Sequence, residues 1–221
     1  MRASDVELAS DRLLETAHPN CARTYDRIAP LYDLLDAAYE RLWKGRLRAE
    51  LFAHAQGRVL DVGIGTGANI PHYPGACAVV GIDSSRGMLE RAADRARSRR
   101  RALDLFQMNL LDLAFADHMF DTVAATFVLI CVPKELQLEA LRELRRVCRP
   151  DGQILILDYR LSSRPVTRTL MRAMSPWLRF AFAGRYDAGT EDHIENAGLR
   201  VALRRSFMQD AVRLLILKPS G

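Results

Sequence analysis

The sequence predicts a doubly wound α/β fold: a mostly parallel seven-stranded sheet with an antiparallel C-terminal hairpin and a helical N-terminal extension. Short apolar runs alternate with longer amphipathic runs from about residue 57, as strands alternate with helices in such folds. The chain has no internal repeat and no Gly/Ser-rich linker, and its last two strand-like runs are joined by a polar turn. This alternation implies a parallel sheet covered by helices on both faces.

Seven segments have the length and apolar character of strands. Five are predicted to be buried, at 58–62, 77–83, 103–108, 121–127 and 153–158. Two more, at 199–207 and 211–217, are predicted to form the hairpin that closes the sheet.

Helices are predicted between these strands. Residues 85–101 and 134–147 have helical length and a 3.6-residue apolar period, and residues 190–197 form a shorter helix before the hairpin. The sequence ArgProAspGly at 149–152 predicts a turn before the fifth strand. Residues 1–55 are predicted to be helical and to precede the sheet.

Composition limits the class of protein. The chain has 49% apolar residues, no uncharged apolar run long enough to span a bilayer, and an acidic first segment without an apolar core. We therefore expect a cytoplasmic protein with neither a transmembrane helix nor a signal peptide. Its cysteines, Cys21, Cys77, Cys131 and Cys148, lie far apart, which predicts free thiols and no metal site.

A glycine-rich loop follows the first predicted strand. Gly63, Gly65 and Gly67 lack the Cβ atoms that would block a ligand and permit positive φ. A dinucleotide loop reads GxGxxG and would place its third glycine where Ala68 stands, so the spacing disfavours NAD. The carboxylate of Asp61, inside the strand, would repel phosphates and attract a cationic ligand such as a sulfonium nucleoside.

A second acid lies at the end of the next strand. Asp83 is 18 residues beyond Gly65, where a carboxylate can accept hydrogen bonds from both ribose hydroxyls. The alternative role is an N-cap for the following helix, which Ser84 or Ser85 could also provide. Met88, one turn into that helix, could pack on an adenine or belong to the core.

Four segments in this order resemble the class I S-adenosylmethionine-dependent methyltransferases. The branch is the one that includes ubiquinone/menaquinone methyltransferases and bacterial phosphatidylethanolamine N-methyltransferases. The segments are TyrAspArgIleAlaProLeuTyrAsp at 25–33, ValLeuAspValGlyIleGlyThrGly at 59–67, GlyIleAspSerSerArgGlyMetLeu at 81–89 and LeuAlaPheAlaAspHisMetPheAspThrVal at 113–123. The resemblance covers roughly residues 22–160 and implies a Rossmann-like sheet with S-adenosyl-L-methionine as the cofactor.

The resemblance also implies residue roles. The glycines would line the methionyl part of the cofactor, Asp83 would hold the ribose and Leu110 would contact the adenine. Asn109 stands where the family usually has an aspartate, and its carbonyl oxygen can still accept from the adenine amino group. Tyr25 and Tyr32 would cap the cofactor, the alternative being helix packing. The predicted cofactor-binding residues are Tyr25, Tyr32, Asp61, Gly63, Gly65, Gly67, Asp83, Ser84, Met88, Asn109, Leu110 and Phe127.

Methyl transfer from a sulfonium mainly requires positioning. Holding acceptor and methyl in line can supply roughly 7–11 kcal/mol, so a catalytic triad is not needed. An amine acceptor must still lose a proton to a base or by desolvation. Tyr25 is our catalytic candidate, and Asp158, Tyr159 and His193 remain alternatives.

A basic segment carries the main indication of the substrate. Between Tyr159 and Tyr186 the chain has six arginines and no acid. A helix is predicted over 165–174, capped by Ser163, and Pro176 is predicted to start a second short piece rich in aromatic residues. Basic residues beside aromatic residues are typical of an interfacial segment, which predicts a membrane lipid as acceptor and an anionic membrane surface as partner.

Two alternatives compete with the lipid interpretation. Leu170, Met174, Leu178 and Phe182 could instead cover the pocket of a soluble enzyme, which leaves quinone precursors and small thiols or amines possible. A nucleic-acid partner is disfavoured because the Asn/Asp-Pro-Pro-aromatic run of base-modifying N-methyltransferases is absent after the fourth strand. The helix around 35–51, with Trp43, Lys44, Arg46 and Arg48, could add a second membrane contact.

The segments combine into one predicted domain. Residues 1–55 are the lid and substrate region, 56–160 the cofactor-binding core, 161–189 the basic insert, and 190–221 the C-terminal helix and hairpin. We expect the protein at the inner membrane face as a peripheral enzyme. The oligomeric state and the acceptor atom stay open.

Overall fold

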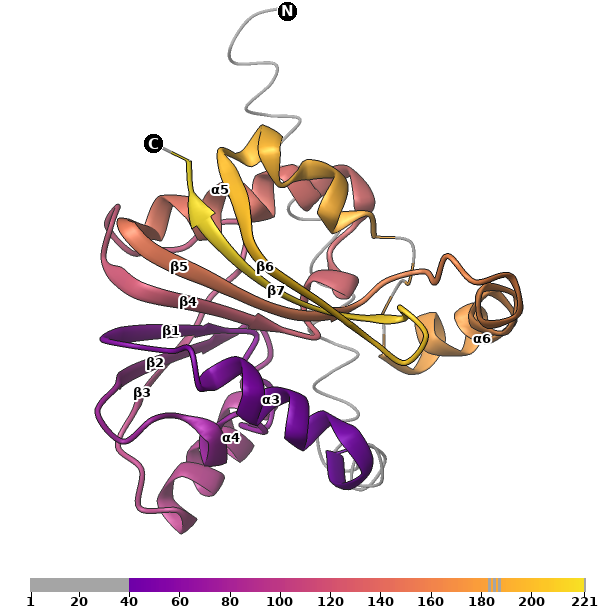
Figure 1. The fold of residues 1–221 in the computed structure, drawn as a ribbon. Helices are drawn as coiled ribbons and strands as arrows, with labels where there is room; N and C mark the ends of the chain where they lie inside the picture. The colour runs from indigo at the N-terminus through magenta and orange to yellow at the C-terminus, as the bar shows by residue number, and fades with distance from the viewer. Residues whose placement is uncertain (1–39, 183, 185, 187, 221) are drawn as a thin grey trace, which may run out of the picture.

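The computed structural model describes residues 40–182, 184, 186 and 188–220. A seven-stranded sheet has the order β3-β2-β1-β4-β5-β7-β6 (Figure 1). The strands are β1 (Arg58–Val62), β2 (Ala78–Asp83), β3 (Asp104–Gln107), β4 (Phe120–Thr126), β5 (Cys148–Tyr159), β6 (Leu199–Phe207) and β7 (Val212–Pro219). The first five are parallel, and β7 runs antiparallel to both β5 and β6. The predicted sheet and hairpin are confirmed.

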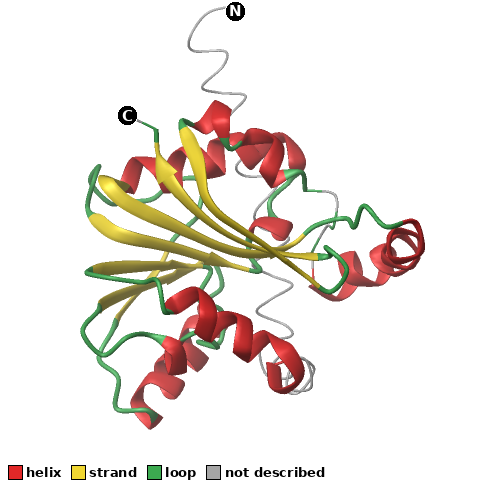
Figure 2. Cartoon of the chain, viewed as in Figure 1, coloured by secondary structure: helices red, strands yellow, loops and turns green. Residues whose placement is uncertain are grey.

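Helices cover both faces of the sheet (Figure 2). The longer ones are η1 (a π-helix, Glu40–Lys44), α3 (Gly45–Phe52), α4 (Arg86–Ser98), α5 (Gln137–Val147) and α6 (Pro165–Phe182). Short 3₁₀ turns are η2 (Ile70–His72), η3 (Leu129–Cys131), η4 (Lys134–Leu136), η5 (Thr190–His193) and η6 (Glu195–Ala197). Figure 1 shows α3 and α4 on one face and α5 on the other.

The core is split between the two faces of the sheet, and β5 shows how. Ile154 and Ile156 pack in the cluster that contains the buried face of α5, whereas Leu155 and Leu157 pack in the cluster that contains α3. Because successive side chains of a strand point to opposite faces, an apolar run buried on both sides is what a doubly wound sheet requires.

The structure differs from the prediction in three segments: the turn at 149–152, the helix at 190–197 and the basic insert. The turn at 149–152 lies within the bounds of β5, but pairing with β4 passes from Cys148 directly to Gln153, so the turn residues stay out of the ladder. The predicted helix at 190–197 is two 3₁₀ turns between Gly189 and Gly198, both of which have positive φ. The left-handed glycines at both ends bound the segment, which folds as two short 3₁₀ turns and not as one α-helix.

The basic insert forms one helix where two pieces were predicted. Helix α6 runs through Pro176, although a proline in a helix interior removes one backbone hydrogen bond. The predicted cap, Ser163, bonds the carboxylate of Asp210, and the helix begins at Pro165. Tyr25, Tyr32 and Cys21 lie outside the described residues, as does the N-terminal extension up to residue 39.

Candidate functional site

A cavity opens at the carboxyl edge of the sheet, between the loops that follow β1 and β4. The strand order reverses between these two strands, and ligands of open α/β sheets bind at such a switch point. The lining residues are Arg48, Gly63, Ile64, Gly65, Thr66, Ala68, Asp83, Ser84, Met88, Met108, Leu110, Thr126, Phe127, Val128, Cys131 and Val132. Seven of the predicted cofactor-binding residues line this cavity: Gly63, Gly65, Asp83, Ser84, Met88, Leu110 and Phe127.

The glycines of the loop have different tasks. All three have positive φ, but a Cβ on Gly63 would meet Val128 at 2.4 Å and one on Gly67 would meet Ile70 at 2.5 Å. A Cβ on Gly65 would meet nothing within 4 Å, so it would project into the open cavity. The loop thus has a bare backbone cradle at Gly65, which fits a ligand lying against the main chain. Gly67 does not line the cavity and serves packing.

The carboxylate of Asp83 lies beside that cradle. One oxygen accepts the backbone N–H of Gly65 at 2.9 Å and the other accepts that of Ser85 at 2.9 Å. A carboxylate oxygen has two acceptor sites, so each oxygen can still accept a ribose hydroxyl. The N-cap of α4 is Ser85, whose hydroxyl accepts the N–H of Met88 at 3.2 Å. The capping role that competed for Asp83 therefore belongs to Ser85.

Asp61 is placed differently from its prediction, because its side chain does not line the cavity. Its carboxylate is fully buried and accepts hydrogen bonds from Asn69 at 2.8 and 3.0 Å and from the hydroxyl of Tyr73. Burial raises the pKa of Asp61 to about 6, against the lowering effect of Tyr73, Asn69 and Arg48. Asp61 therefore does not contact a ligand in the cavity directly, because Asn69 and Tyr73 occupy its carboxylate.

Arg48 is the charged residue that the sequence reasoning did not assign to this cavity. The residue is 6% exposed, and its guanidinium donates to Asn69 at 2.6 Å, Thr126 at 2.9 Å and Glu40 at 2.8 Å. It can hold a ligand carboxylate, because a guanidinium presents a planar fork of donors. No local motif marks it, since helix α3 reaches the cavity only after folding.

The opposite end of the cavity is apolar. Met88, Met108 and Leu110 line it, and Met88 is buried. Such a wall suits the flat face of an adenine. Asn109 does not line the cavity: its side-chain carbonyl accepts the N–H of Leu111 at 2.9 Å. The acceptor role that was predicted for Asn109 would use the remaining lone pair of that oxygen.

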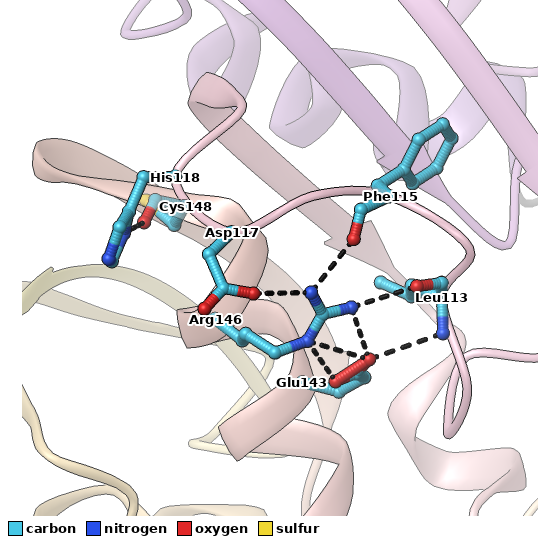
Figure 3. Close-up of polar contacts among 7 residues, drawn as sticks. All are labelled: Leu113, Phe115, Asp117, His118, Glu143, Arg146 and Cys148. Carbon is cyan, nitrogen blue, oxygen red and sulfur yellow. Dashed lines mark hydrogen bonds and ion pairs between the residues drawn. The ribbon is translucent and has the colours of Figure 1, made fainter.

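The loop after Leu110 is held from α5 by Arg146 (Figure 3). Its guanidinium donates to the carbonyl of Leu113 at 2.8 Å, to that of Phe115 at 2.8 Å and to Asp117 at 2.7 Å. Glu143 pairs with Arg146 at 2.7 Å and accepts the N–H of Leu113 at 3.2 Å. These contacts raise the pKa of Arg146 and fix the segment that carries the apolar wall.

An aromatic cluster reaches the cavity through Phe127. Phe127 packs 5.1 Å from Tyr159 and 6.0 Å from Trp43, measured between ring centroids. Lys44 and Arg48 are buried there, at 6% exposure each, whereas Leu42 and Arg46 are exposed. The second membrane contact that was expected at Trp43, Lys44, Arg46 and Arg48 is therefore wrong for the buried Lys44 and Arg48, and it stays a prediction for Trp43 and Arg46.

The predicted bases lie in different places. Asp158 is buried and accepts the N–H of Ile130 at 3.1 Å and that of Tyr159 at 2.7 Å. Burial raises the pKa of Asp158 to about 7. Asp158 and Tyr159 line a second cavity of about 300 Å³, which does not include His193. The catalytic candidate Tyr25 lies outside the described residues.

Together the sheet, the bare glycine cradle and the strand-end carboxylate define a nucleoside-binding α/β protein. Residues 59–152 match a family described as "Methyltransferase domain". A phosphatidylethanolamine N-methyltransferase of Cereibacter sphaeroides is 36% identical over 62% of this chain and 67% of its own length. A demethylmenaquinone methyltransferase of Thermobifida fusca is 33% identical over 76% of this chain and 74% of its own.

A solved structure, a SAM-dependent methyltransferase from Aquifex aeolicus, has the same fold. Its TM-score is 0.64 at 19% identity, with 87% of this chain and 97% of that chain covered. The chain belongs to the class I S-adenosylmethionine-dependent methyltransferases. Its cofactor is S-adenosyl-L-methionine, which supplies an electrophilic methyl group on a sulfonium. Among the described residues, no helix is long and apolar enough to cross a membrane.

Proposed function

We propose that the enzyme methylates the amino headgroup of a membrane phospholipid, converting phosphatidylethanolamine toward phosphatidylcholine, and works peripherally at the inner membrane face. In this role Asp83 holds the cofactor ribose, the loop at Gly63 and Gly65 and the side chain of Arg48 hold the methionyl part, and Met88 and Leu110 hold the adenine. Asn109 remains a proposed contact of the adenine amino group.

The observation that carries the lipid proposal is an exposed apolar stripe on α6. The side chains of Val166, Leu170 and Met174 are 84%, 60% and 41% exposed. They are spaced by four residues, so they share one face of the helix. Helix α6 follows β5 at the carboxyl edge of the sheet, where the cofactor cavity opens, and projects beyond it (Figure 1). Leu170 and Met174 do not line that cavity.

Charge on the same helix supports an anionic surface as the partner. Arg164, just before the helix, and Arg172 are exposed, whereas Arg168 bonds the carbonyls of Ser162 and Ser163 at 2.8 Å each. Arg172 is two residues from Leu170 and Met174, so it lies across the helix from the stripe and would reach an anionic surface by its long side chain. Each arginine near an anionic leaflet contributes about 1 kcal/mol to binding. Apolar side chains that enter the interface would add to this attraction.

Methyl transfer requires mainly that the protein positions the acceptor nitrogen against the methyl group of the cofactor. The acceptor nitrogen attacks the methyl carbon while the carbon–sulfur bond breaks. The electron pair of the broken bond stays on sulfur. The nitrogen must be a free amine, so one proton of the ammonium leaves first, to a base or to water. Asp158 is our candidate among the described residues because its raised pKa allows it to take up a proton near neutral pH.

A second candidate is C-methylation of a quinone precursor, which the relative from Thermobifida fusca favours by name. Both reactions are tested at once by incubating the protein with methyl-labelled cofactor and a total membrane lipid extract. Mass spectrometry then identifies the labelled species. A labelled aminophospholipid supports the proposal, a labelled quinone supports the second candidate, and no labelled lipid counts against both. Asp83→Ala serves as the inactive control.

Vesicle binding tests the stripe itself. We expect Leu170→Glu to weaken binding to vesicles that contain an anionic lipid by about tenfold, since a charge replaces an apolar side chain in the interface. Val201→Glu is the matched control, because Val201 is also exposed but lies on the edge strand β6. Sedimentation with vesicles measures both variants. Equal loss in the two variants, or in neither, would remove α6 as the docking element.

A further inference from the structure

Three aromatic side chains pack together, one of them at the cofactor cavity and another at the second cavity. Trp43 comes from η1, Phe127 follows β4 and Tyr159 ends β5. Each ring contacts the other two: Trp43 lies 6.0 Å from both, edge to face, and Phe127 lies 5.1 Å from Tyr159. These three rings are called the aromatic cage below.

One ring of the cage lines each cavity. Phe127 lines the cofactor cavity, and Tyr159 lines the second cavity of about 300 Å³. Phe127 has a φ of 54°, a conformation that bulky residues rarely adopt. Such backbone strain is retained where the surrounding structure demands a particular side-chain position. A group bound against the cage would therefore be near the cofactor on one side and near Asp158 on the other.

Two of the three rings, Phe127 and Trp43, already have a positive charge over them. The ammonium nitrogen of Lys44 lies 4.9 Å from the ring centroid of Phe127 and 5.9 Å from that of Trp43. The guanidinium carbon of Arg48 lies 5.1 Å from the ring of Phe127. These distances are within the about 6 Å over which a cation is attracted to an aromatic face. An ammonium thus has a favourable place against these rings.

We propose that the aromatic cage binds the ammonium of the acceptor, so that the acceptor is an alkylamine which becomes a better guest with each added methyl group. This inference rests on the proposed function and names the part of the chain that recognises the headgroup. In this proposal the incoming ammonium takes the place that the buried Lys44 ammonium occupies at the rings of Phe127 and Trp43. A methylated ammonium carries its charge on apolar methyl groups, which is the ligand that aromatic cages recognise.

A quinone would not use the cage in this way. It carries no positive charge, so it gains nothing from the negative ring faces beyond apolar contact. The two acceptor classes can therefore be separated by binding alone, without turnover. The suitable pair of probes is choline and 3,3-dimethylbutan-1-ol, which have the same shape and differ in charge.

The test uses the full chain with Trp177→Phe, which leaves Trp43 as the single tryptophan. The protein is saturated with S-adenosylhomocysteine, and the fluorescence of Trp43 is followed while each probe is added. We expect choline to bind at least about fivefold more tightly than the neutral probe, as a cation on two or three rings should. Equal affinities would overturn the proposal, because they would show a merely apolar pocket.

Variants locate the effect. Tyr159→Leu should abolish the preference for choline, and Tyr159→Phe should keep it. Phe106→Leu should also keep it, since Phe106 is a half-exposed ring on β3 that packs on Phe115, away from the cage. Lys44→Met should tighten choline binding about threefold by removing the cation that competes for the rings. A preference that survives Tyr159→Leu would overturn the proposal.

Failure of the cage and failure of the proposed function give different results. If the lipid extract yields a labelled aminophospholipid but choline shows no preference, the function stands and the cage is wrong. If choline shows the expected preference but no amine lipid is labelled, the cage stands as a cation site and the lipid function is wrong.

Discussion

The two halves of the site are built by different means. The cofactor half, which comprises the loops after β1 and β2 and the segment 108–117, is held by directional hydrogen bonds between residues 2 to 33 positions apart in the sequence. The acceptor half, which comprises the aromatic cage, Asp158 and α6, joins residues more than a hundred positions apart. Close approach of a nucleoside demands fixed backbone geometry, whereas an apolar, cationic headgroup requires ring faces and an exposed stripe.

The largest expected effect tests the cofactor half at Asp83. Asp83→Ala should weaken binding of S-adenosylhomocysteine by about 100-fold or more, since hydrogen bonds to a charged group are worth about 1.5–3 kcal/mol each and two are lost. Isothermal calorimetry measures the affinity. Asp94→Ala is the matched control, because Asp94 is an exposed acid on α4 that pairs with Arg97. Unchanged affinity in Asp83→Ala would show that this carboxylate does not hold the ribose.

The next effect concerns the support of the apolar wall. Arg146→Lys should lower the free energy of unfolding by about 2 kcal/mol, because an ammonium cannot reach two carbonyls and two carboxylates at once. The melting temperature should fall by about 5 °C for a chain of this size. Arg142→Lys, an exposed arginine on the same helix, is the control. Equal melting temperatures for the two variants would contradict the role that we give to Arg146.

Alanine substitutions at two glycines distinguish an effect of backbone conformation from an effect of the added side-chain volume. An added Cβ meets nothing within 4 Å at either Gly65 or Gly75, but only Gly65 has positive φ and faces the cofactor cavity. Gly65→Ala should weaken binding of S-adenosylhomocysteine about tenfold. Backbone strain should also lower the free energy of unfolding by about 1–2 kcal/mol. Gly75→Ala should leave affinity unchanged. If both variants bind like the parent chain, the ligand does not lie against Gly65.

This contrast also explains how much the sequence could predict. The strands, the hairpin and the cofactor loop were predicted because apolar period and glycine spacing are local properties. Asp61 was assigned to the cavity because its neighbours in the loop line it, yet its side chain points to the buried side, where Asn69 and Tyr73 bind it. Strand position alone did not reveal those two partners.

The acceptor half was predicted less well because its members share no local pattern. Tyr159 was named only as a possible base, and Trp43 only as a membrane contact, although both pack on Phe127. Lys44 and Arg48 looked like surface charges on an amphipathic helix, and only folding shows them buried. The continuous helix through Pro176 was missed because proline is a helix terminator in most contexts.

The last prediction, a dependence on pH and not a single loss, tests whether the acceptor half holds a buried acid that gains a proton near neutral pH. The pKa of Asp158 is raised from 3.8 to about 7 by burial, so between these values the folded chain is protonated there and the unfolded chain is not. Folding then takes up a proton, and stability falls as pH rises, by about 1.4 kcal/mol per pH unit at most. Asp158→Asn removes this dependence of stability on pH. It also lowers the free energy of unfolding by a constant amount, because one hydrogen bond is altered.

Urea denaturation from pH 4 to pH 8 measures this difference. The free energy of unfolding of Asp158→Asn, relative to the parent chain, should rise with pH up to about 7 and then level off. Asp104→Asn, at an exposed site that begins β3, is the control for a general effect of removing a carboxylate. Asp61 has a pKa raised in the same direction, but it is present in both chains and cancels in the difference. A constant difference across this range would mean that Asp158 stays ionised in the folded enzyme, and the acceptor's proton would then need another base.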